Sequence, residues 1–274
     1  MMTARLFTAL AALAIMLTPA MAEDTVLLHA AGSLRAALTD VARAFEATGP
    51  GKVQAKFGAS GLLKDEIAAG AKAEVFASAN MEHPLALSAA KRSGPVALFA
   101  RNRLCALVRP GLDVAPAALL DRMLDPQIKL GTSTPKADPS GDYAWEVFRK
   151  AEKLKPGAFA ILEKKALQLT GGPASPPAPQ GRSIYGELIA QGAADVFLTY
   201  CTNALAAQRE NPAQQIVQLP DTLVVGADYG LTVMNGASVP AYQFALFILS
   251  AEGQRTLAKH GFAAPALPQP GPPQ

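Results

Sequence analysis

Residues 26–34 read VLLHAAGSL and residues 53–62 read VQAKFGASGL, and each stretch predicts a strand, a turn with a serine, and the start of a helix. Serine at a helix start is typical of an N-cap, because its oxygen accepts a hydrogen bond from a backbone N–H that has no partner within the helix. Ser33 and Ser60 therefore mark two helix N-termini at one edge of a predicted parallel sheet. Such an edge can hold an anion without any cationic side chain.

The first 22 residues have the features of a secretory signal peptide. Arg5 precedes an apolar run at residues 6–17, and the segment ends in the small-x-small pattern Ala20-Met21-Ala22. The run is too short to span a bilayer, and no later stretch approaches the roughly 20 apolar residues of a spanning helix. We expect cleavage after Ala22 and export to the periplasm of a Gram-negative bacterium.

The charge balance excludes one class of partner. The chain has 25 Lys and Arg residues against 22 Asp and Glu residues, and loss of Arg5 with the signal peptide brings the mature chain closer to neutral. Nucleic-acid binding favours a strongly basic face, so we expect no nucleic-acid partner.

Cys105 and Cys201 are the two cysteines of the sequence. In an oxidising compartment they can form a disulfide that closes a loop of roughly 100 residues. Two buried free thiols are the alternative, and the sequence does not decide between them. The C-x-x-C spacing of redox sites and zinc ribbons does not occur.

Further along the chain, predicted strands alternate with predicted helices, which indicates an α/β fold with mostly parallel sheets. Ser140 and Ser183 stand at two more helix starts, and Tyr200 ends the buried strand predicted over residues 195–200. Ligands of open α/β sheets bind outside the carboxyl ends of the strands. These hydroxyls, with Ser33 and Ser60, are therefore placed to surround an oxyanion.

Catalytic and metal-binding patterns are poorly represented. Ser88-Ala89-Ala90-Lys91 matches S-x-x-K, but it lies inside a predicted helix and the partner motifs of that enzyme class are missing. The three histidines, His29, His83 and His260, lack the spacing of metal ligands. We therefore predict a binding protein that is not an enzyme.

Several motifs resemble those of periplasmic molybdate-binding proteins. Residues 30–34 (AAGSL), 57–60 (FGAS) and 67–80 (IAAGAKAEVFASAN) are similar to the family patterns A-A-S-L, F-x-S-S and I-x-x-G-A-P-A-D-L-F-I-S-A-D. The similarity resumes over residues 139–144 (PSGDYA), 196–203 (VFLTYCTN) and 253–262 (GQRTLAKHGF).

The resemblance implies a two-lobed type II periplasmic binding fold. Each lobe would be a mostly parallel sheet flanked by helices, with lobe 1 formed by residues 23–100 and 223–274 and lobe 2 by residues 101–222. The lobes would open and close about crossovers near residues 101–104 and 219–223. The resemblance further implies a monomeric solute-binding component of an ABC importer, with an inner-membrane permease as its partner, molybdate or tungstate as its ligand, and no cofactor.

Carried over by position, the family's anion contacts fall on the hydroxyls of Ser33, Ser60 and Tyr200, on the backbone of Ser140, and on the backbone of Arg182 with Ser183 beside it. The protein itself would contribute no metal ligand. Two departures from the family pattern stand out: Gly61 replaces a hydroxyl residue, and Arg182 replaces an apolar one.

Arg182 leaves two readings open. In the cleft, its paired N–H donors would favour another small anion or an organic carboxylate, for a transporter or a sensor. Pointing outward, it would leave a site of the molybdate type. Beside it, the Pro-rich residues 171–180 are interpreted as a surface excursion, because prolines lack the N–H donors of strands and helices.

Overall fold

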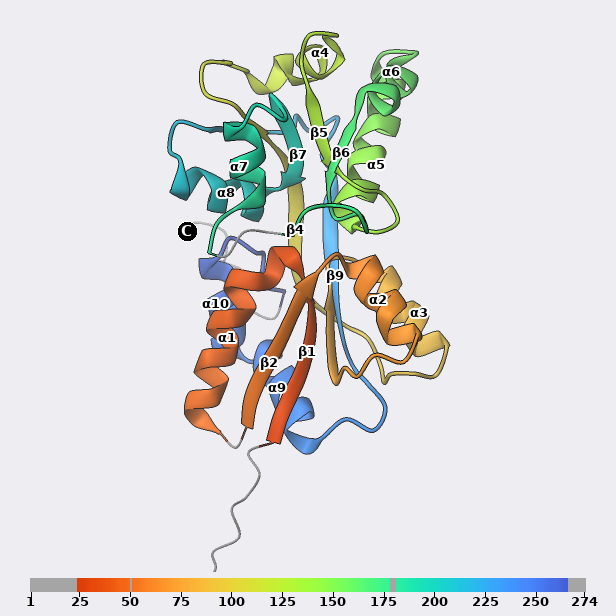
Figure 1. Ribbon diagram of the computed structural model, residues 1–274, viewed down its shortest axis with the longest axis vertical. Helices are drawn as coiled ribbons and strands as arrows, with labels where there is room; N and C mark the ends of the chain where they lie inside the picture. Colours follow the sequence, from red (N-terminus) through yellow and green to blue (C-terminus); the bar gives the residue numbers. More distant parts are fainter. Residues whose placement is uncertain (1–23, 50, 178–180, 266–274) are drawn as a thin grey trace, which may run out of the picture.

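A computed structural model describes residues 24–49, 51–177 and 181–265 of the 274-residue chain. The predicted signal peptide lies outside these residues. Within them, no helix combines the length and the apolar character that crossing a membrane requires. Figure 1 shows two groups of elements, one above the other, linked by two long strands.

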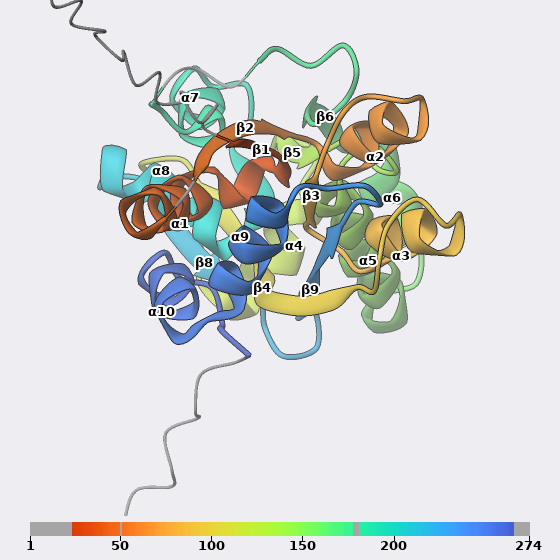
Figure 2. The same cartoon turned by 90° about the horizontal axis from the view of Figure 1, so that it is seen from below.

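The lower group in Figure 1 contains both serine corners of the opening stretch. Strand β1 pairs in parallel with both β2 and β3, so helices must carry the chain across between these strands. Figure 2 shows α1, α9 and α10 on one side of these strands and α2 and α3 on the other. The elements are β1 (Asp24–Ala31), η1 (Gly32–Leu34), α1 (Arg35–Thr48), β2 (Gly51–Gly58), α2 (Ser60–Ala68), β3 (Val75–Ser78), α3 (Glu82–Ala89), α9 (Val239–Leu249) and α10 (Ala251–Lys259).

The upper group repeats the arrangement. Strand β5 pairs in parallel with β6 and β7. The elements are η2 (Pro116–Ala118), α4 (Leu119–Leu124), β5 (Leu130–Ser133), α5 (Pro139–Leu154), α6 (Ala158–Lys165), β6 (Leu167–Thr170), α7 (Ile184–Ala190), β7 (Val196–Tyr200), α8 (Cys201–Glu210) and β8 (Gln215–Gln218).

Two long strands, β4 (Ala97–Val108) and β9 (Gly226–Val233), connect the groups. β4 pairs with β9 up to Arg103, with β7 from Leu104 onward and with β8 from Cys105 onward. The strand order is β2-β1-β3-β9-β4-β7-β5-β6, with β8 beside β4. Pairing is parallel where helices connect the strands and antiparallel around β4 and β9, so the sheet is mixed at its centre.

The core follows from the helical periodicity of the first unit. Helix α1 buries a stripe of apolar residues that ends at Phe45. The Phe45 ring lies 5.2 Å from the ring of Phe244 on α9, measured between centroids. The first helix is thereby packed against the penultimate one, which closes the lower group around β1 and β3.

A disulfide joins Cys105 on β4 to Cys201, the first residue of α8, with 4.9 Å between the Cα atoms. Of the two alternatives that the sequence left open, the structure therefore contains the bridge. It fixes β4 to the residue that follows Tyr200.

Candidate functional site

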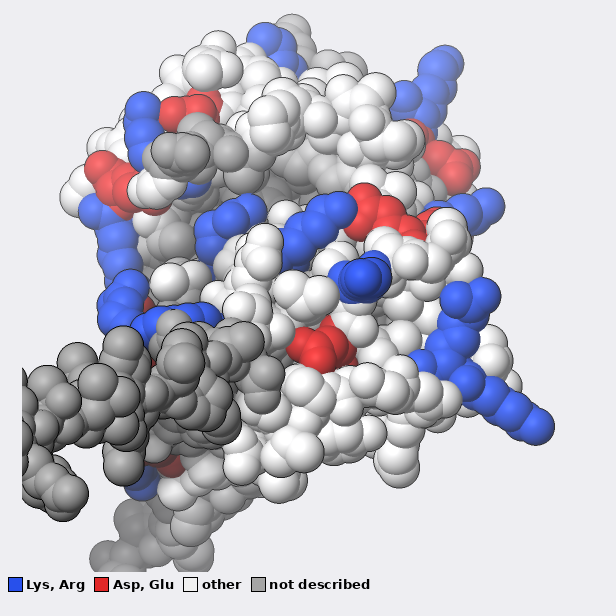
Figure 3. Space-filling model, turned by 60° about the horizontal axis from the view of Figure 1, so that its bottom comes forward, with Lys and Arg blue, Asp and Glu red and all other residues white. Residues whose placement is uncertain are grey.

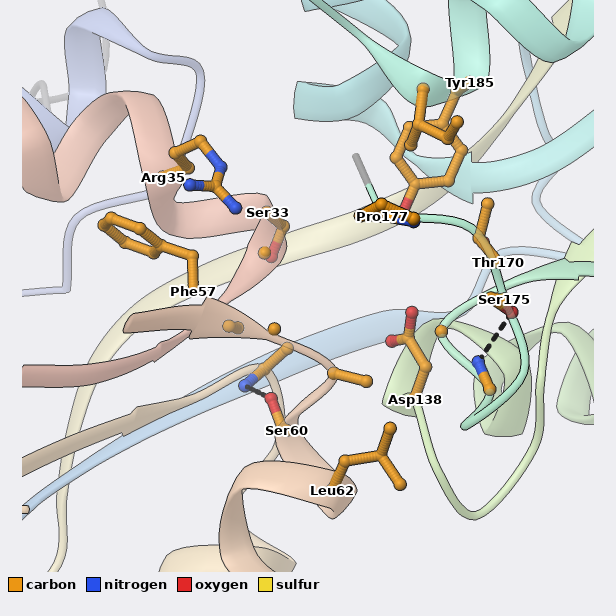
Figure 4. Close-up of a pocket in the computed structure, with 18 of the residues that line it drawn as sticks. Ser33, Arg35, Phe57, Ser60, Leu62, Asp138, Thr170, Ser175, Pro177 and Tyr185 are labelled. Atoms are coloured by element: carbon orange, nitrogen blue, oxygen red, sulfur yellow. Dashed lines mark hydrogen bonds between the residues drawn. The ribbon is translucent and has the colours of Figure 1, made fainter. Parts of the chain in front are cut away.

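A cavity of about 310 Å³ lies between the two groups of elements, and Figure 4 shows the side chains around it. It opens where β1, β2, β6 and β7 end, as expected for ligand sites of α/β sheets. Three of the predicted site residues line it, namely Ser33, Ser60 and Tyr200.

Ser33 lies in the short turn η1 between β1 and α1. Its hydroxyl oxygen is 3.0 Å from the phenol oxygen of Tyr229 on β9. The prediction that Ser33 caps the following helix is wrong, because no side chain caps α1. Its hydroxyl instead connects the first corner to a long central strand.

Ser60 is the first residue of α2 and is 1% exposed. Its hydroxyl oxygen accepts a hydrogen bond from the backbone N–H of Ala79 at 3.1 Å, and it does not cap its own helix. The prediction that Ser60 caps its own helix is therefore wrong. As for Ser33, the hydroxyl bonds to a residue that is distant in the sequence. Because the oxygen is the acceptor in this bond, the hydroxyl hydrogen of Ser60 is free to be donated into the cavity.

Tyr200 ends β7 and is 1% exposed. Its hydroxyl lies 3.4 Å from the carbonyl oxygen of Ala79, and its ring packs against that of Tyr229 at 5.6 Å between centroids. Burial raises the pKa of Tyr200 well above its ordinary value. Tyr200 therefore stays protonated, and it donates its one hydrogen to the carbonyl oxygen of Ala79 in this arrangement.

Ser140 does not line this cavity. Its backbone N–H, the predicted anion donor, is donated to a carboxylate oxygen of Asp138 at 3.1 Å. Its hydroxyl is fully buried and has no hydrogen-bond partner within the described residues. The Asp138 carboxylate thus accepts the backbone N–H of Ser140, which the resemblance assigns to the anion.

Arg182 and Ser183 lie in a neighbouring groove of about 550 Å³. The Arg182 side chain is 64% exposed and forms an ion pair with Glu187 at 2.8 Å. The Ser183 hydroxyl caps α7, as predicted, by accepting from the N–H of Gly186 at 3.3 Å. Its backbone N–H is donated to both carboxylate oxygens of Glu210, at 2.9 and 3.0 Å. The structure does not bring these two residues to the first cavity.

Two charged residues of the cavity were missed by the sequence analysis. Arg35 begins α1 and lines both the cavity and the groove, with its guanidinium carbon 4.8 Å from the centre of the Phe57 ring. Asp138 lines the cavity from the opposite group, as Figure 4 shows. The signal for Asp138 was local, because an Asp immediately before Pro139 is typical of an N-cap followed by the first helical residue.

The charge state of Asp138 is unusual. Burial raises the pKa of its carboxyl group to about 6, although the N–H of Ser140 favours the ionised form. Asp142, one turn further along α5, raises it further by charge repulsion. The cavity thus combines uncharged donors, one cation and one weakly acidic carboxyl group.

The Pro-rich segment forms part of the cavity wall. Gly171, Gly172, Ser175, Pro176 and Pro177 line the cavity. Pro173, Ala174, Pro176 and Pro177 are exposed, as the prediction of a surface excursion requires, but the segment also borders the cavity, which was not predicted. Residues 178–180 lie outside the described residues. Composition identified a rigid loop but gave no information on what the loop packs against.

On the face that Figure 3 shows, Lys and Arg side chains are interspersed with Asp and Glu side chains and with uncharged surface. Among the residues that the structure describes, no group of three His, Cys, Asp or Glu side chains is arranged to hold a metal ion.

Comparisons of the sequence with known proteins find similarity to solute-binding proteins of bacteria. A family profile described as bacterial extracellular solute-binding protein matches residues 26–263. An uncharacterised protein of Pasteurella multocida (strain Pm70) is 34% identical over 234 residues, which cover 85% of this chain and 96% of that protein. The molybdate-binding protein ModA of Mycobacterium bovis is 26% identical over 267 residues, covering 90% of this chain and 87% of that protein.

Solved structures agree at the level of the fold. The sulfate-binding protein SubI from Mycobacterium tuberculosis has a TM-score of 0.73 at 19% sequence identity, and the match covers 88% of this chain and 87% of that one.

Proposed function

The chain belongs to the family of bacterial extracellular solute-binding proteins, the solute-binding components of ABC transporters, and we propose that its ligand is a small tetrahedral oxyanion, molybdate or tungstate. Its fold class, the α/β fold of periplasmic binding proteins, is confirmed by the similarity to SubI. We further propose that the chain acts in the periplasm as a monomer, delivers the anion to an inner-membrane permease, and uses no cofactor.

One observation supports the oxyanion above all others. Ser33, Ser60 and Tyr200 come from three separate parts of the chain and line one cavity at the ends of the strands. The hydroxyl hydrogen of Ser60 is free, because its oxygen accepts from Ala79. Hydroxyls that converge from different elements can satisfy several oxygens of one tetrahedral anion.

The relatives support the same class of ligand. ModA of Mycobacterium bovis is named for molybdate and SubI for sulfate, and both anions are tetrahedral. The N–H groups of Ser140 and Ser183 are already bonded to carboxylates. In the proposed complex the contacts from the upper group therefore come from Tyr200, whose hydroxyl turns from the Ala79 carbonyl oxygen to the anion, and from the loop at residues 170–171.

A second candidate is a small organic anion. The observation that favours it is Arg35, which lines both the cavity and the adjoining groove and so offers paired N–H donors to a larger ligand. This differs from the sequence hypothesis, which assigned that role to Arg182. Arg182 instead pairs with Glu187 in the groove.

Titration calorimetry on the purified protein separates these candidates. Molybdate, tungstate, sulfate and phosphate form the inorganic panel, and small phosphorylated and carboxylated organic acids form the second. We expect Ser60→Ala to weaken binding of the inorganic anion about 5- to 150-fold, the loss of one to three kcal/mol typical of a buried hydrogen bond. Ser88→Ala, on α3 and outside the cavity, is the matched control and is expected to bind as the wild type does.

An absence of heat with every inorganic anion would remove the oxyanion assignment. Binding that occurs only with the organic panel would establish the second candidate in its place.

A further inference from the structure

Asp138 presents a carboxyl group to the cavity in which we place the anion. Its side chain lines the cavity together with Ser33, Ser60 and Tyr200. Figure 4 shows its oxygens directed toward the space between the two groups of elements. One oxygen also accepts the N–H of Ser140 at 3.1 Å, which holds the carboxyl group in this orientation as the cap of α5.

A carboxylate and an oxyanion cannot share this space as they stand. Both are hydrogen-bond acceptors, and two like charges repel strongly in a partly buried site. A hydrogen bond between them requires one hydrogen, which neither a carboxylate nor a fully ionised molybdate or sulfate carries.

The surroundings of Asp138 do not supply a neutralising cation. No ion pair to Asp138 occurs within residues 24–49, 51–177 and 181–265. The groups that face it are Asp142 on its own helix, Ser133 on β5, Tyr185 on α7 and Tyr200 on β7. Burial raises the pKa of both tyrosines above the ordinary range, so they remain neutral. Arg35 lines the cavity from the opposite group.

We propose that Asp138 is a ligand-contacting residue that shares one proton with the bound oxyanion, which makes the site proton-coupled. This inference rests on the proposed function. For a fully ionised anion, the proton comes from solvent: the carboxylate and one proton form the carboxylic acid, whose O–H is donated to a ligand oxygen. Hydrogen phosphate brings its own proton, and its P–O–H is donated to the carboxylate, so no proton is taken up.

The carboxyl group is suited to this exchange because it gains a proton easily. With its pKa raised to about 6 by burial, it is mostly ionised in neutral solution yet needs only a small change of environment to become protonated. A nearby dianion favours the neutral form still more. The same carboxylate disfavours a ligand that carries no proton and does not raise the pKa of Asp138 enough for the carboxyl group to take one from solvent.

The number of protons taken up can be measured by calorimetry at pH 8 in two buffers that differ in their enthalpy of ionisation. We expect the wild-type protein to take up about one proton for each molybdate or sulfate bound and close to none for each phosphate. Over pH 7–9, its affinity for molybdate should fall about tenfold for each unit of pH, which is the slope for one linked proton.

Asp138→Asn should abolish both effects. Asn keeps the cap of α5 and already carries N–H donors, so the variant needs no proton. We expect it to bind molybdate without proton uptake, and to shift the preference between sulfate and phosphate at least tenfold toward sulfate. Asp113→Asn is the matched control, because Asp113 is exposed and does not line the cavity.

The outcomes separate the two proposals. Molybdate or sulfate binding with no proton uptake by the wild-type protein would overturn the shared proton while leaving the oxyanion function intact. This measurement needs no variant to fold. If only phosphate binds, an unchanged anion preference in Asp138→Asn would overturn it as well. If no oxyanion binds at all, the proposed function fails and the shared proton fails with it.

Discussion

At the scale of single residues, the serines of the two corners bond to distant partners and not to their own helices. The Ser60 oxygen accepts the N–H of Ala79, the residue that follows β3, in a fully buried position. Ser33 contacts Tyr229, a separation of 196 residues. Each hydroxyl therefore has a structural partner as well as a place in the cavity, and its removal should affect folding as well as binding.

Ser60→Ala should lower the free energy of unfolding of the ligand-free protein by about 1–3 kcal/mol, because the N–H of Ala79 would be left buried without an acceptor. Urea unfolding measured without ligand checks this. Ser88→Ala, which has no comparable buried bond among the described contacts, should change the midpoint much less. Equal midpoints for wild type and Ser60→Ala would contradict the structural role.

The raised pKa of Asp138 predicts a dependence of stability on pH. The group titrates at about 6 in the folded protein and at its ordinary value near 3.8 when unfolded. Between these values the folded state holds more protons than the unfolded state, so stability falls as pH rises. The contribution is fully present below about pH 4 and is lost above about pH 6, with an upper limit of about 3 kcal/mol.

Asp138→Asn should remove this contribution, because the amide does not titrate. Relative to the wild type, the ligand-free variant should gain stability between pH 4.5 and pH 7.5, which urea unfolding at the two pH values measures. A difference between the two proteins that stays constant with pH would show that Asp138 has an ordinary pKa.

At the scale of secondary-structure elements, the disulfide links β4 to the first residue of α8. The two cysteines are 96 residues apart, and the chain-entropy relation gives about 4–5 kcal/mol for a loop of that length. The replacement of both cysteines by alanine should lower the free energy of unfolding by about 2–5 kcal/mol and make the midpoint insensitive to reductant. An oxidised and a reduced wild-type protein that unfold at the same denaturant concentration would contradict this.

The elements themselves were predictable, because their signals are local. Apolar periodicity and turn residues identified β1, β2, α1 and α2 from residues 26–62, and Ser183 was correctly identified as a cap. The partners of the serines were not predictable, because Tyr229 lies far from Ser33 along the chain. The place of the loop over residues 171–177 was not predictable either, because its composition does not show that it lines the cavity.

The site was predicted in part for a related reason. The resemblance selected Ser33, Ser60 and Tyr200 as anion contacts, and the structure places these three residues along one cavity. It could not reveal that the N–H groups of Ser140 and Ser183 are bonded to carboxylates, since Asp138 and Glu210 have no counterpart in the motifs that carry the resemblance. A departure from a family pattern alters the site only through such contacts, and the sequence alone does not show which residues are in contact.

At the scale of the whole molecule, several contacts between the two groups of elements involve backbone atoms beside the cavity. The N–H of Gly61, in the first turn of α2, donates to the carbonyl oxygen of Ala137 at 2.9 Å. The carbonyl oxygen of Ala79 is 3.4 Å from the hydroxyl of Tyr200 and 3.5 Å from that of Tyr143. These contacts join the two groups close to Ser60, which lines the cavity.

Gly61 stands where the family pattern has a hydroxyl residue, and the contact with the upper group explains the change. A Cβ atom at position 61 would lie 2.7 Å from the carbonyl oxygen of Ala137 and closer still to that of Lys136. Both obstacles are backbone atoms, which cannot move aside as the end of a flexible side chain can. A side chain at this position is therefore incompatible with the closed arrangement.

Gly61→Ala should therefore hold the two groups apart, because the added methyl collides with the second group before the contact forms. In proteins of this architecture, hinge closure around a ligand stabilises the complex, so we expect affinity for the bound oxyanion to fall at least tenfold. Small-angle scattering with saturating ligand should give a larger radius of gyration for the variant than for the wild type. Gly49→Ala is the matched control, because a Cβ there meets its nearest neighbour at an ordinary 3.7 Å and lies away from the cavity. If the Gly61→Ala complex scatters as the wild-type complex does, then closure does not depend on the bare backbone at Gly61.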